Sequence, residues 1–311
     1  MDSSHSDLIS VFNGYGDITE IDLLRKYTSG QPIHVDKLTG LVFVKNRRES
    51  KDIADEWSKS VYKSNPEKPF DYKYTGMLPI MKSRHLFAID CLNKIIPRGL
   101  EGKSLLDIGA GEGYFLKLAK DFYGAKVFGI EPSLENCTKL DKQKIPNFNG
   151  TAEDYFSLFS ENEKFDLITL NWTLCNCSNI NNIMKIVFEL LTEDGLIMVS
   201  DSSRLLTPFK KSLSLYFEPS LPLDLHPWFF SFNTIRCLMV VHGFVPIFQN
   251  NHHEQNDLIT IAAKKKNIKS SVKPEDFFDD YKKVIEFFKR WENESQFYKQ
   301  RDRGGFNLLS K

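Results

Sequence analysis

The sequence predicts an α/β fold, in which a parallel β-sheet is covered by helices on both faces. Three observations support this prediction. Short apolar runs typical of buried strands alternate with helical periodicity from residue 103 to residue 263. The first run, 104–108, ends in glycines at alternate positions, and a helical stretch follows at once. The chain has 311 residues, which is enough for one substantial core with further segments on either side.

The expected sheet has seven strands, each an apolar run bounded by turn residues. The last two runs are joined by polar residues at 249–256, a connection short enough for an antiparallel hairpin. A helix is expected at 80–96, where an apolar stripe would face the sheet, and Pro97 and Gly99 end it. We place the strands at 103–108, 126–131, 146–149, 165–170, 194–200, 244–249 and 256–263.

Composition and charge exclude several classes of protein. Lysine plus arginine and aspartate plus glutamate each number 41, and this balance argues against a dedicated nucleic-acid binder. The sequence has no apolar run near the roughly 20 residues of a membrane span, and its first residues lack the pattern of a signal peptide. Five scattered cysteines indicate reduced thiols, so a cytoplasmic location is expected.

The apolar run at 104–108 leads directly into a glycine-rich turn. Glycines at 109, 111 and 113 let the backbone turn sharply and let a ligand approach it closely. The N–H groups at the start of the following helix point into the same space. Glu131 ends the next apolar run, 18 residues after Gly113, where its carboxylate can accept hydrogen bonds from ribose hydroxyls. A nucleotide-like ligand is therefore expected at this turn.

The spacing of the glycines distinguishes between nucleotide ligands. Dinucleotide-binding turns have the pattern G-x-G-x-x-G, whereas this chain has G-x-G-x-G, which argues against an NAD-dependent oxidoreductase. The run Asp107-x-Gly109-x-Gly111-x-Gly113 resembles motif I of the class I S-adenosylmethionine (SAM) dependent methyltransferases. The resemblance covers about residues 80–263. It implies SAM as the cofactor and a Rossmann-like seven-stranded sheet of order 3-2-1-4-5-7-6, in which strand 7 is antiparallel.

The same resemblance assigns roles to residues at the carboxyl ends of the first two strands. Asp107 would lie beside the amino-acid part of SAM, and Gly109, Gly111 and Gly113 would form the wall against it. Glu131 would accept hydrogen bonds from the ribose. Both carboxylates are expected at the edge where open α/β sheets bind their ligands, although each residue could also be a helix cap or a surface group.

Further assignments follow from later motifs of the same family. Thr151 and Ala152, after the third strand, would meet the adenine ring, and Asn171, at the end of the fourth, would touch cofactor and acceptor. Arg84 precedes the first strand, in a region from which many relatives direct a basic or aromatic residue to the methionyl carboxylate. For Arg84 two interpretations remain open, that contact or a solvated position on the helix.

The acceptor side departs from the patterns of the family. Asn171-Trp172-Thr-Leu differs from the Asn/Asp-Pro-Pro-aromatic motif of enzymes that methylate adenine, which argues against a nucleobase acceptor. Where many small-molecule relatives have Glu-His, this chain has Cys175-Asn176, so a general base is missing there. The best candidate base is His226, which could instead cap a helix. Trp172 and Trp228 are candidate pocket walls, with core packing as the alternative.

The first 79 residues are expected to form a cap over the site. Residues 33–44 resemble the small zinc-binding module of some sugar C-methyltransferases, but Asp36 and Thr39 stand where that module has cysteines. A tetrahedral zinc site needs four thiolate or imidazole ligands, which this segment cannot supply, so no metal is expected. Residues 64–79 are rich in proline and aromatic residues and indicate a linker or a loop over the site.

Two segments follow the expected methyltransferase domain of residues 80–263. Residues 264–274 carry five lysines and indicate an exposed linker. Residues 275–311 would form an amphipathic helix and a tail, whose apolar stripe packs on the same chain or on a second copy in a homodimer. The stripe consists of the residues at 277, 278, 281, 284, 285, 288 and 291.

The sequence therefore predicts a cytoplasmic SAM-dependent methyltransferase that acts on a small molecule or a nucleotide-linked sugar. Two alternatives remain open. The chain could methylate a protein or an RNA, with residues 1–79 and the lysine-rich linker holding the macromolecule. It could also be a SAM-binding scaffold without an acceptor site, which uses its C-terminal helix to hold another protein. The departure at Cys175-Asn176 keeps this second alternative open.

Overall fold

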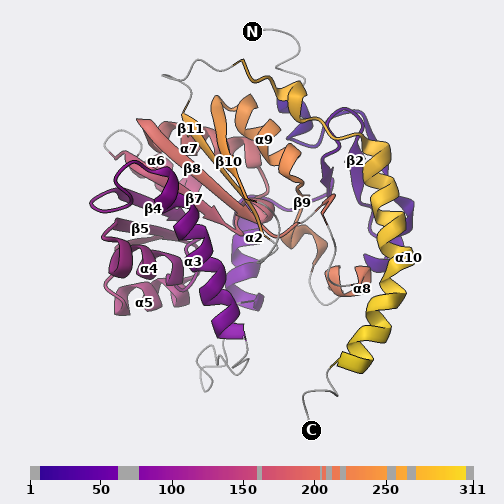
Figure 1. Cartoon of the computed structure of the whole chain (residues 1–311), viewed down its shortest axis with the longest axis horizontal. Coiled ribbons are helices and arrows are strands. Elements are labelled where there is room, and N and C mark those ends of the chain that lie inside the picture. Colours follow the sequence, from indigo (N-terminus) through magenta and orange to yellow (C-terminus); the bar gives the residue numbers. More distant parts are fainter. Residues whose placement is uncertain are drawn as a thin grey trace.

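The structure is a computed structural model of the chain in which a large and a small β-sheet lie side by side (Figure 1). Within the described ranges, the side chains of 60–61, 77–82, 215 and 295–305 are not described. Most of the loop expected at 64–79, most of the linker at 264–274, and the ends of the expected cap and tail lie outside the described residues. The structure describes residues 8–61, 77–159, 163–203, 205–207, 212–217, 222–250, 257–264 and 271–305.

The large sheet has seven strands in the order β6-β5-β4-β7-β8-β11-β10. The first five strands in this order are parallel, and β11 is antiparallel to both of its neighbours. This order confirms the expected arrangement 3-2-1-4-5-7-6. The strands are β4 (Ser104–Ile108), β5 (Lys126–Glu131), β6 (Asn147–Asn149), β7 (Phe165–Asn171), β8 (Leu191–Asp201), β10 (Phe244–Gln249) and β11 (Leu258–Lys264).

Helices cover both faces of this sheet because successive strand residues point to opposite sides. In β4, Leu105 packs with helices α3, α4 and α5, whereas its neighbour Leu106 packs with α6, α7 and α9. Two apolar layers therefore enclose the sheet, as expected for strands buried on both faces. The helices are α3 (Met77–Ile95), α4 (Tyr114–Tyr123), α5 (Leu134–Lys142), α6 (Ala152–Phe159), α7 (Ile180–Leu190) and α9 (Phe232–Val241).

The small sheet joins segments that are far apart in the sequence. Its order is β1-β2-β3-β9, and each strand pairs antiparallel with the next. The first three strands come from the N-terminal segment, and β9 comes from the connection between β8 and α9. The strands are β1 (Ile18–Glu20), β2 (His34–Asp36), β3 (Val42–Phe43) and β9 (Trp228–Phe229).

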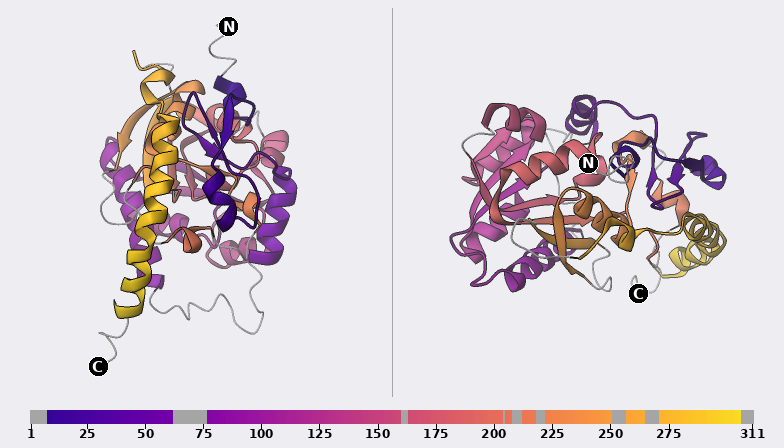
Figure 2. Two further views of the ribbon diagram at one scale, coloured as in Figure 1. Left: turned by 90° about the vertical axis from the view of Figure 1, so that its right-hand side faces the viewer. Right: turned by 90° about the horizontal axis from the view of Figure 1, so that it is seen from above.

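The C-terminal helix α10 (Tyr281–Gly305) runs along this small sheet (Figure 2). Its side chains Val284, Phe288 and Trp291 are at most 2% exposed and share one apolar cluster with Val35 and Phe229. Of the two partners considered for the stripe, this part of it thus packs on the same chain. A second copy cannot use these three side chains without first displacing the helix.

A short helix, α2 (Ser50–Glu56), follows strand β3 of the small sheet in the sequence. It continues into a π-helical turn at Trp57–Val61 and closes one side of the cavity described below. Among the described residues, no helix combines the length and the apolar character needed to cross a membrane. The same residues contain no group of three or more His, Cys, Asp or Glu side chains suited to a metal ion.

Candidate active site

A cavity of about 550 Å³ lies at the carboxyl ends of β4, β5 and β7, between the glycine-rich turn and helix α2. This is the edge at which open α/β sheets bind ligands. Arg84, Gly113, His226 and Trp228 are not among the residues that line it. The expected site residues that do line it are Asp107, Gly109, Gly111, Glu131, Thr151, Ala152, Asn171 and Trp172.

The three glycines of the turn all have positive φ angles, but they face different surroundings. A Cβ atom at Gly111 would meet no atom within 4 Å, so this backbone is open to a ligand. At Gly113 a Cβ would lie 2.3 Å from Leu140 Cδ2, and at Gly109 it would lie 2.3 Å from Thr173 Oγ1. Gly111 therefore fits a close ligand approach, whereas Gly113 lets the start of α4 pack against α5.

Asp107 lies near the end of β4 and is 1% exposed. Its Oδ1 accepts hydrogen bonds from Thr169 Oγ1 at 2.6 Å and from Asn171 Nδ2 at 3.1 Å. Burial raises the pKa of Asp107 to about 7, although these hydrogen bonds act in the opposite direction. A cationic ligand group beside this side chain would favour its ionised form.

Glu131 ends β5 and is 4% exposed. Its two carboxylate oxygens accept hydrogen bonds from backbone N–H groups, Oε2 from Gly111 at 2.7 Å and Oε1 from Ser133 at 2.9 Å. Burial raises the pKa of Glu131, and these bonds oppose the rise. Because an ionised carboxylate offers about four acceptor positions, the side chain can still accept hydrogen bonds from ligand hydroxyls.

Thr151 and Ala152 lie where β6 leads into α6, beside the cavity. The hydroxyl of Thr151 caps this helix, since Oγ1 accepts a hydrogen bond from Asp154 N at 3.1 Å. The Asp154 carboxylate in turn accepts a hydrogen bond from Thr151 N at 3.1 Å. The side chain of Thr151 is thus already used to cap the helix, and the hydroxyl is not the group expected to bind a ligand in the cavity.

Three buried polar atoms on the cavity wall have no hydrogen-bond partner among the described residues: Asn171 Oδ1, Trp172 Nε1 and His85 Nδ1. Leaving such atoms without partners costs about 1–3 kcal/mol each. Their clustering on one wall, together with the open backbone at Gly111, fits a site built for a polar ligand. The residues present therefore fit a nucleotide-like cofactor.

His85 is a cavity residue that the sequence interpretation missed. It lies on α3, with its ring 4.9 Å from that of Trp172 and 6.1 Å from that of Phe115. Burial lowers the pKa of His85 to about 4, so its imidazole is neutral near pH 7. Neighbouring helix positions point about 100° apart, and the chain directs His85 rather than Arg84 into the cavity.

Arg84 instead forms an ion pair with Asp257 outside the cavity wall. Its Nε donates to Asp257 Oδ2 at 2.8 Å, and its Nη2 donates to Oδ1 at 2.5 Å. The guanidinium carbon also lies 4.1 Å from the centre of the Trp172 ring. Neither sequence interpretation, a methionyl contact or a solvated position, describes these contacts.

His226 lies at the rim of the cavity and is exposed. Its Nδ1 is 2.5 Å from Asn176 Oδ1, and its ring meets the edge of Trp57 at 5.3 Å between centroids. Both of these neighbours line the cavity. Trp57 was not singled out from the sequence.

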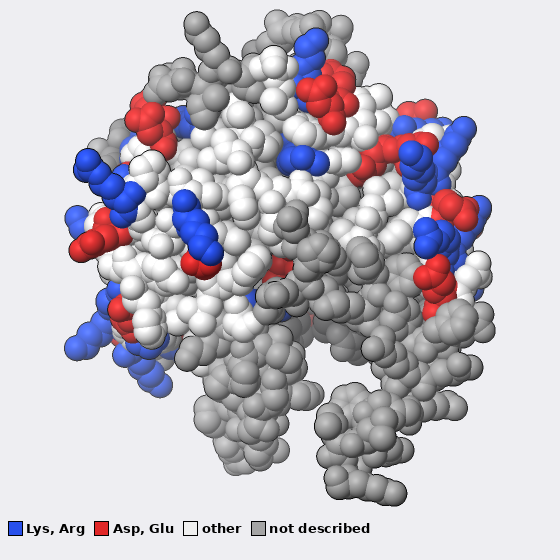
Figure 3. Space-filling view, in the orientation of Figure 1, with Lys and Arg blue, Asp and Glu red and all other residues white. Residues whose placement is uncertain are grey.

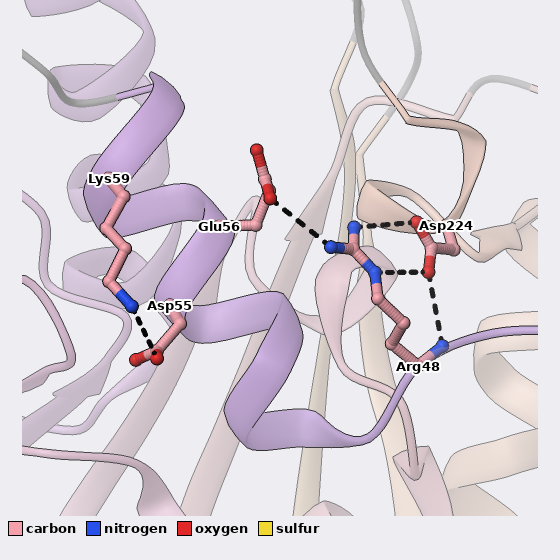
Figure 4. Close-up of polar contacts among 5 residues, drawn as sticks. All are labelled: Arg48, Asp55, Glu56, Lys59 and Asp224. Carbon is pink, nitrogen blue, oxygen red and sulfur yellow. Dashed lines mark hydrogen bonds and ion pairs between the residues drawn. The ribbon is translucent and has the colours of Figure 1, made fainter.

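An arginine holds helix α2 against the loop that carries His226 (Figure 4). Arg48 donates from Nε and Nη2 to the two oxygens of Asp224 at 2.8 and 2.9 Å, and from Nη1 to Glu56 at 3.3 Å. Burial of Asp224 would raise its pKa, but the hydrogen bonds from Arg48 lower it below the usual value. The pairs fix the distance between α2 and the loop before His226.

Trp228 lies in the core and not on the cavity wall. Its ring is fully buried, its Nε1 donates to Cys177 O at 2.7 Å, and Arg47 covers one face at 4.3 Å. The expectation that Trp228 forms a pocket wall is corrected here in favour of core packing. The reason is its place in β9, which pairs with β3 and turns the indole inward.

The family model of the methyltransferase domain matches residues 81–251, more than half of the chain. The chain therefore belongs to the SAM-dependent methyltransferases, and SAM is its cofactor. The match begins in α3 and ends after β10, so it contains the glycine-rich turn, Asp107 and Glu131.

Two individual relatives share 32% and 24% sequence identity with this chain, each over part of its length. The chain is 32% identical over 114 residues to a ubiquinone biosynthesis O-methyltransferase of Glaesserella parasuis, covering 34% of this chain and 48% of the relative. It is 24% identical over 182 residues to a demethylmenaquinone methyltransferase of Lactococcus lactis subsp. lactis, covering 53% and 71% of the two chains. The chain thus spans about half the length of the first relative.

A solved structure shares the fold. It is a chain from the complex between the Haloferax volcanii Trm112 methyltransferase activator and a methyltransferase, with a TM-score of 0.50 and 15% identity. The match covers 70% of this chain and 99% of the other. At this identity the likeness concerns the arrangement of strands and helices alone.

Proposed function

We propose that this chain transfers the methyl group of SAM to an uncharged small-molecule acceptor with an aromatic or similarly flat apolar ring. The observation that carries the proposal is a single cavity with two different halves. One half presents Asp107, Glu131 and the open backbone at Gly111, and the other presents the indole of Trp57. The indole of Trp172 borders both halves.

The cofactor half offers a match for each polar part of SAM. When bound, SAM supplies a methyl group on a positively charged sulfur. Glu131 would accept hydrogen bonds from the ribose hydroxyls, and the Asp107 carboxylate would bind the ammonium group. The wall of His85, Asn171 and Trp172 would supply donors and acceptors to the methionyl part, in place of the role considered for Arg84.

Charge on the cavity wall favours an uncharged acceptor over a nucleotide-linked sugar. A diphosphate is bound most readily by arginine and lysine, or by several converging N–H groups. The one lysine or arginine among the described lining residues is Lys117, whereas the acids are Asp107, Glu112, Glu131 and Glu153. The names of the two bacterial relatives, which concern ubiquinone and menaquinone, also favour a ring-containing acceptor.

The acceptor half has one candidate for proton removal. His226 would take a proton from an acceptor hydroxyl, and Asn176 would hold the imidazole by its Nδ1. Such a base is needed only if the acceptor must lose its proton near neutral pH. Much of the remaining rate enhancement would come from alignment of the reacting atoms and exclusion of water by Trp57 and Trp172.

The macromolecular alternative has less support. Lysine, arginine, aspartate and glutamate are interspersed on the face shown in Figure 3, and no broad basic tract crosses its described residues. A nucleic-acid acceptor normally requires such a tract to bind phosphates. A strong dependence of RNA affinity on salt would favour this alternative over a small-molecule acceptor.

Calorimetric titration with SAM and S-adenosylhomocysteine, with NAD as the control ligand, tests the cofactor half. We expect micromolar binding of both sulfur ligands and no binding of NAD. Asp107→Ala and Glu131→Ala should abolish binding of the sulfur ligands while the chain stays folded. Asp121→Ala, which removes a surface carboxylate paired with Lys117, is the matched control and should bind normally. Unchanged affinity in both site variants contradicts the cofactor assignment.

Methyl transfer from labelled SAM to hydroxylated aromatic compounds, and separately to nucleotide sugars, tests the acceptor half. Transfer to the first group supports the proposal, and transfer to the second group alone contradicts it. Tight SAM binding without turnover on either group or on cell extracts would instead support the scaffold alternative. His226→Asn should then reduce turnover about 10²-fold with little change in SAM affinity.

A further inference from the structure

Trp172 adopts a backbone conformation that few residues of its size tolerate. Its φ angle is +55°, in the left-handed region that disfavours bulky side chains. It directly follows Asn171, which donates to Asp107, and its own N–H donates to Ser200 O at 2.7 Å. The ring lines the cavity. Something outside the local backbone must therefore stabilise this orientation.

The side chain of Arg84 covers the Trp172 ring. The guanidinium carbon is 4.1 Å from the ring centre, and the edge-on contact from His85 comes from the same helix. A cation above an indole is attracted by the ring electrons, and the attraction is stronger where water is excluded. Helix α3 thus contacts Trp172 through two successive residues.

Arg84 is itself fixed by Asp257, the residue directly before β11. Its fork-like pair of hydrogen bonds to Asp257 sets both the position and the plane of the guanidinium. The side chains of Arg84 and Asp257 are 17% and 2% exposed, respectively. Asn250 braces Asp257 in turn, because its Nδ2 donates to Asp257 O at 2.9 Å and its Oδ1 accepts from Ile259 N at 2.8 Å.

We propose that Arg84 and Asp257 are positioning residues, which hold the indole of Trp172 in place as a wall of the active-site cavity. The β10–β11 hairpin contributes none of the described lining residues, and through this pair it would still shape the site. The inference rests on the proposed function in one respect, namely that the cavity binds SAM and its product. The arrangement of the three side chains does not depend on it.

Arg84→Lys is the central test because lysine keeps the charge beside Asp257 but lacks the planar fork. We expect S-adenosylhomocysteine affinity to fall about tenfold, on the order of the attraction between a desolvated cation and an indole. Asp257→Asn, which acts on Trp172 only through Arg84, should lower affinity in the same direction. Wild-type affinity in both folded variants overturns the proposal.

Arg47→Lys is the matched control. Arg47 covers the ring of Trp228 at 4.3 Å in the same manner, but that ring does not line the cavity. The control should lower the melting temperature without changing affinity for S-adenosylhomocysteine. An equal loss of affinity in Arg84→Lys and Arg47→Lys would mean that both act through general stability.

A double-mutant cycle with Trp172→Phe separates positioning from a purely structural role. Arg84→Lys should cost about tenfold in the wild-type background and less than threefold in the Trp172→Phe background, because the indole is then absent. Equal costs in the two backgrounds contradict the proposal, since they would show that Arg84 acts independently of Trp172.

Fluorescence gives a readout that does not need a ligand. Subtracting the spectra of the Trp172→Phe background isolates the emission of Trp172, which should shift to longer wavelength in Arg84→Lys as water reaches the ring. If the wild-type chain binds no S-adenosylhomocysteine, the proposed function fails while this shift still tests the positioning role. An unchanged Trp172 spectrum in that case overturns the positioning role as well.

Discussion

Trp172 and Trp228 each have an arginine over the indole ring, but the two rings lie in different parts of the molecule. Each indole is covered by an arginine, at 4.1 Å for Arg84 and 4.3 Å for Arg47. Trp228 lies in the small sheet, and its Nε1 donates to Cys177 O. Trp172 lines the cavity, and its Nε1 has no partner among the described residues. The Trp228 ring therefore belongs to a packed core, whereas the Nε1 donor of Trp172 is available to a ligand.

The two regions differ in where their buried polar atoms without hydrogen-bond partners among the described residues lie: Asp36 Oδ2 and His34 Nδ1 of the small sheet lie away from the cavity, whereas those of the cavity wall line it. In the small sheet, Asp36 Oδ1 accepts hydrogen bonds from the N–H groups of Leu38 and Thr39 and from Thr39 Oγ1. On the cavity wall, buried polar atoms of His85 and Asn171 have no such partners in the described chain. Buried polar groups without partners reduce stability, and on the cavity wall a bound ligand can supply the missing partners.

The largest expected contrast comes from removing each indole. Trp228→Ala should lower the free energy of unfolding by about 3–5 kcal/mol, because it empties a fully buried position. Trp172→Ala should cost about 1–2 kcal/mol but abolish detectable binding of S-adenosylhomocysteine. Urea unfolding measures the first quantity and calorimetry the second. Equal losses of stability would mean that Trp172 is also a core residue.

The second contrast concerns pH. The pKa of Asp107 is about 7 in the folded chain against 3.8 for the free side chain. Between these two pH values the Asp107 carboxyl is therefore protonated in the folded chain and ionised in the unfolded chain. Stability should therefore fall as pH rises from about 4 to about 7 and change little above that. Asp107→Asn keeps an oxygen for Thr169 and Asn171, and should be more stable than the wild type by about 1–2 kcal/mol at pH 8.

Ligand binding should show the opposite trend for the same side chain. Because a cationic ligand favours the ionised carboxylate, affinity for SAM should rise from pH 6 to pH 8 and binding should release protons near pH 6.5. Calorimetry in buffers of different ionisation enthalpy detects this release. Asp36→Asn is the control, since Asp36 is also buried but lies outside the cavity. Release that persists in Asp107→Asn would assign it to another group.

The cofactor half could be predicted from the sequence because its signals are local. Asp107, Gly109 and Gly111 stand within five residues, and Glu131 ends the adjacent strand. In a parallel sheet, the strand ends bring such residues together without further information. The order of the seven strands was expected from the resemblance to the class I methyltransferases, and the structure confirms it.

The remaining features could not be predicted in the same way, because they depend on distant pairings and on side-chain direction. The two-residue strand β9 pairs with β3 from the N-terminal segment, and this turns Trp228 into the core. Arg84 and His85 are neighbours on one helix, and periodicity alone does not decide which of them faces the cavity. The apolar stripe of α10 could be recognised in the sequence, but the surface that covers it comes from side chains within residues 21–44 and from Leu205, Leu213, Phe217 and Phe229.

The smallest expected effect concerns the turn at 36–39, which follows β2 of the small sheet and does not line the cavity. Here hydrogen bonds from Thr39 to Asp36 hold the turn that two cysteines and a zinc ion would hold in the module it resembles. Thr39→Val removes the hydroxyl donor at nearly constant volume and should cost about 1 kcal/mol, with no change in affinity for S-adenosylhomocysteine. A chelator should leave the melting temperature of the wild type unchanged, because a carboxylate and a hydroxyl do not supply the four thiolate or imidazole ligands of a tetrahedral zinc site. A fall in melting temperature with chelator, reversed by added zinc, would show that this region also depends on a ligand and would remove its contrast with the cavity wall.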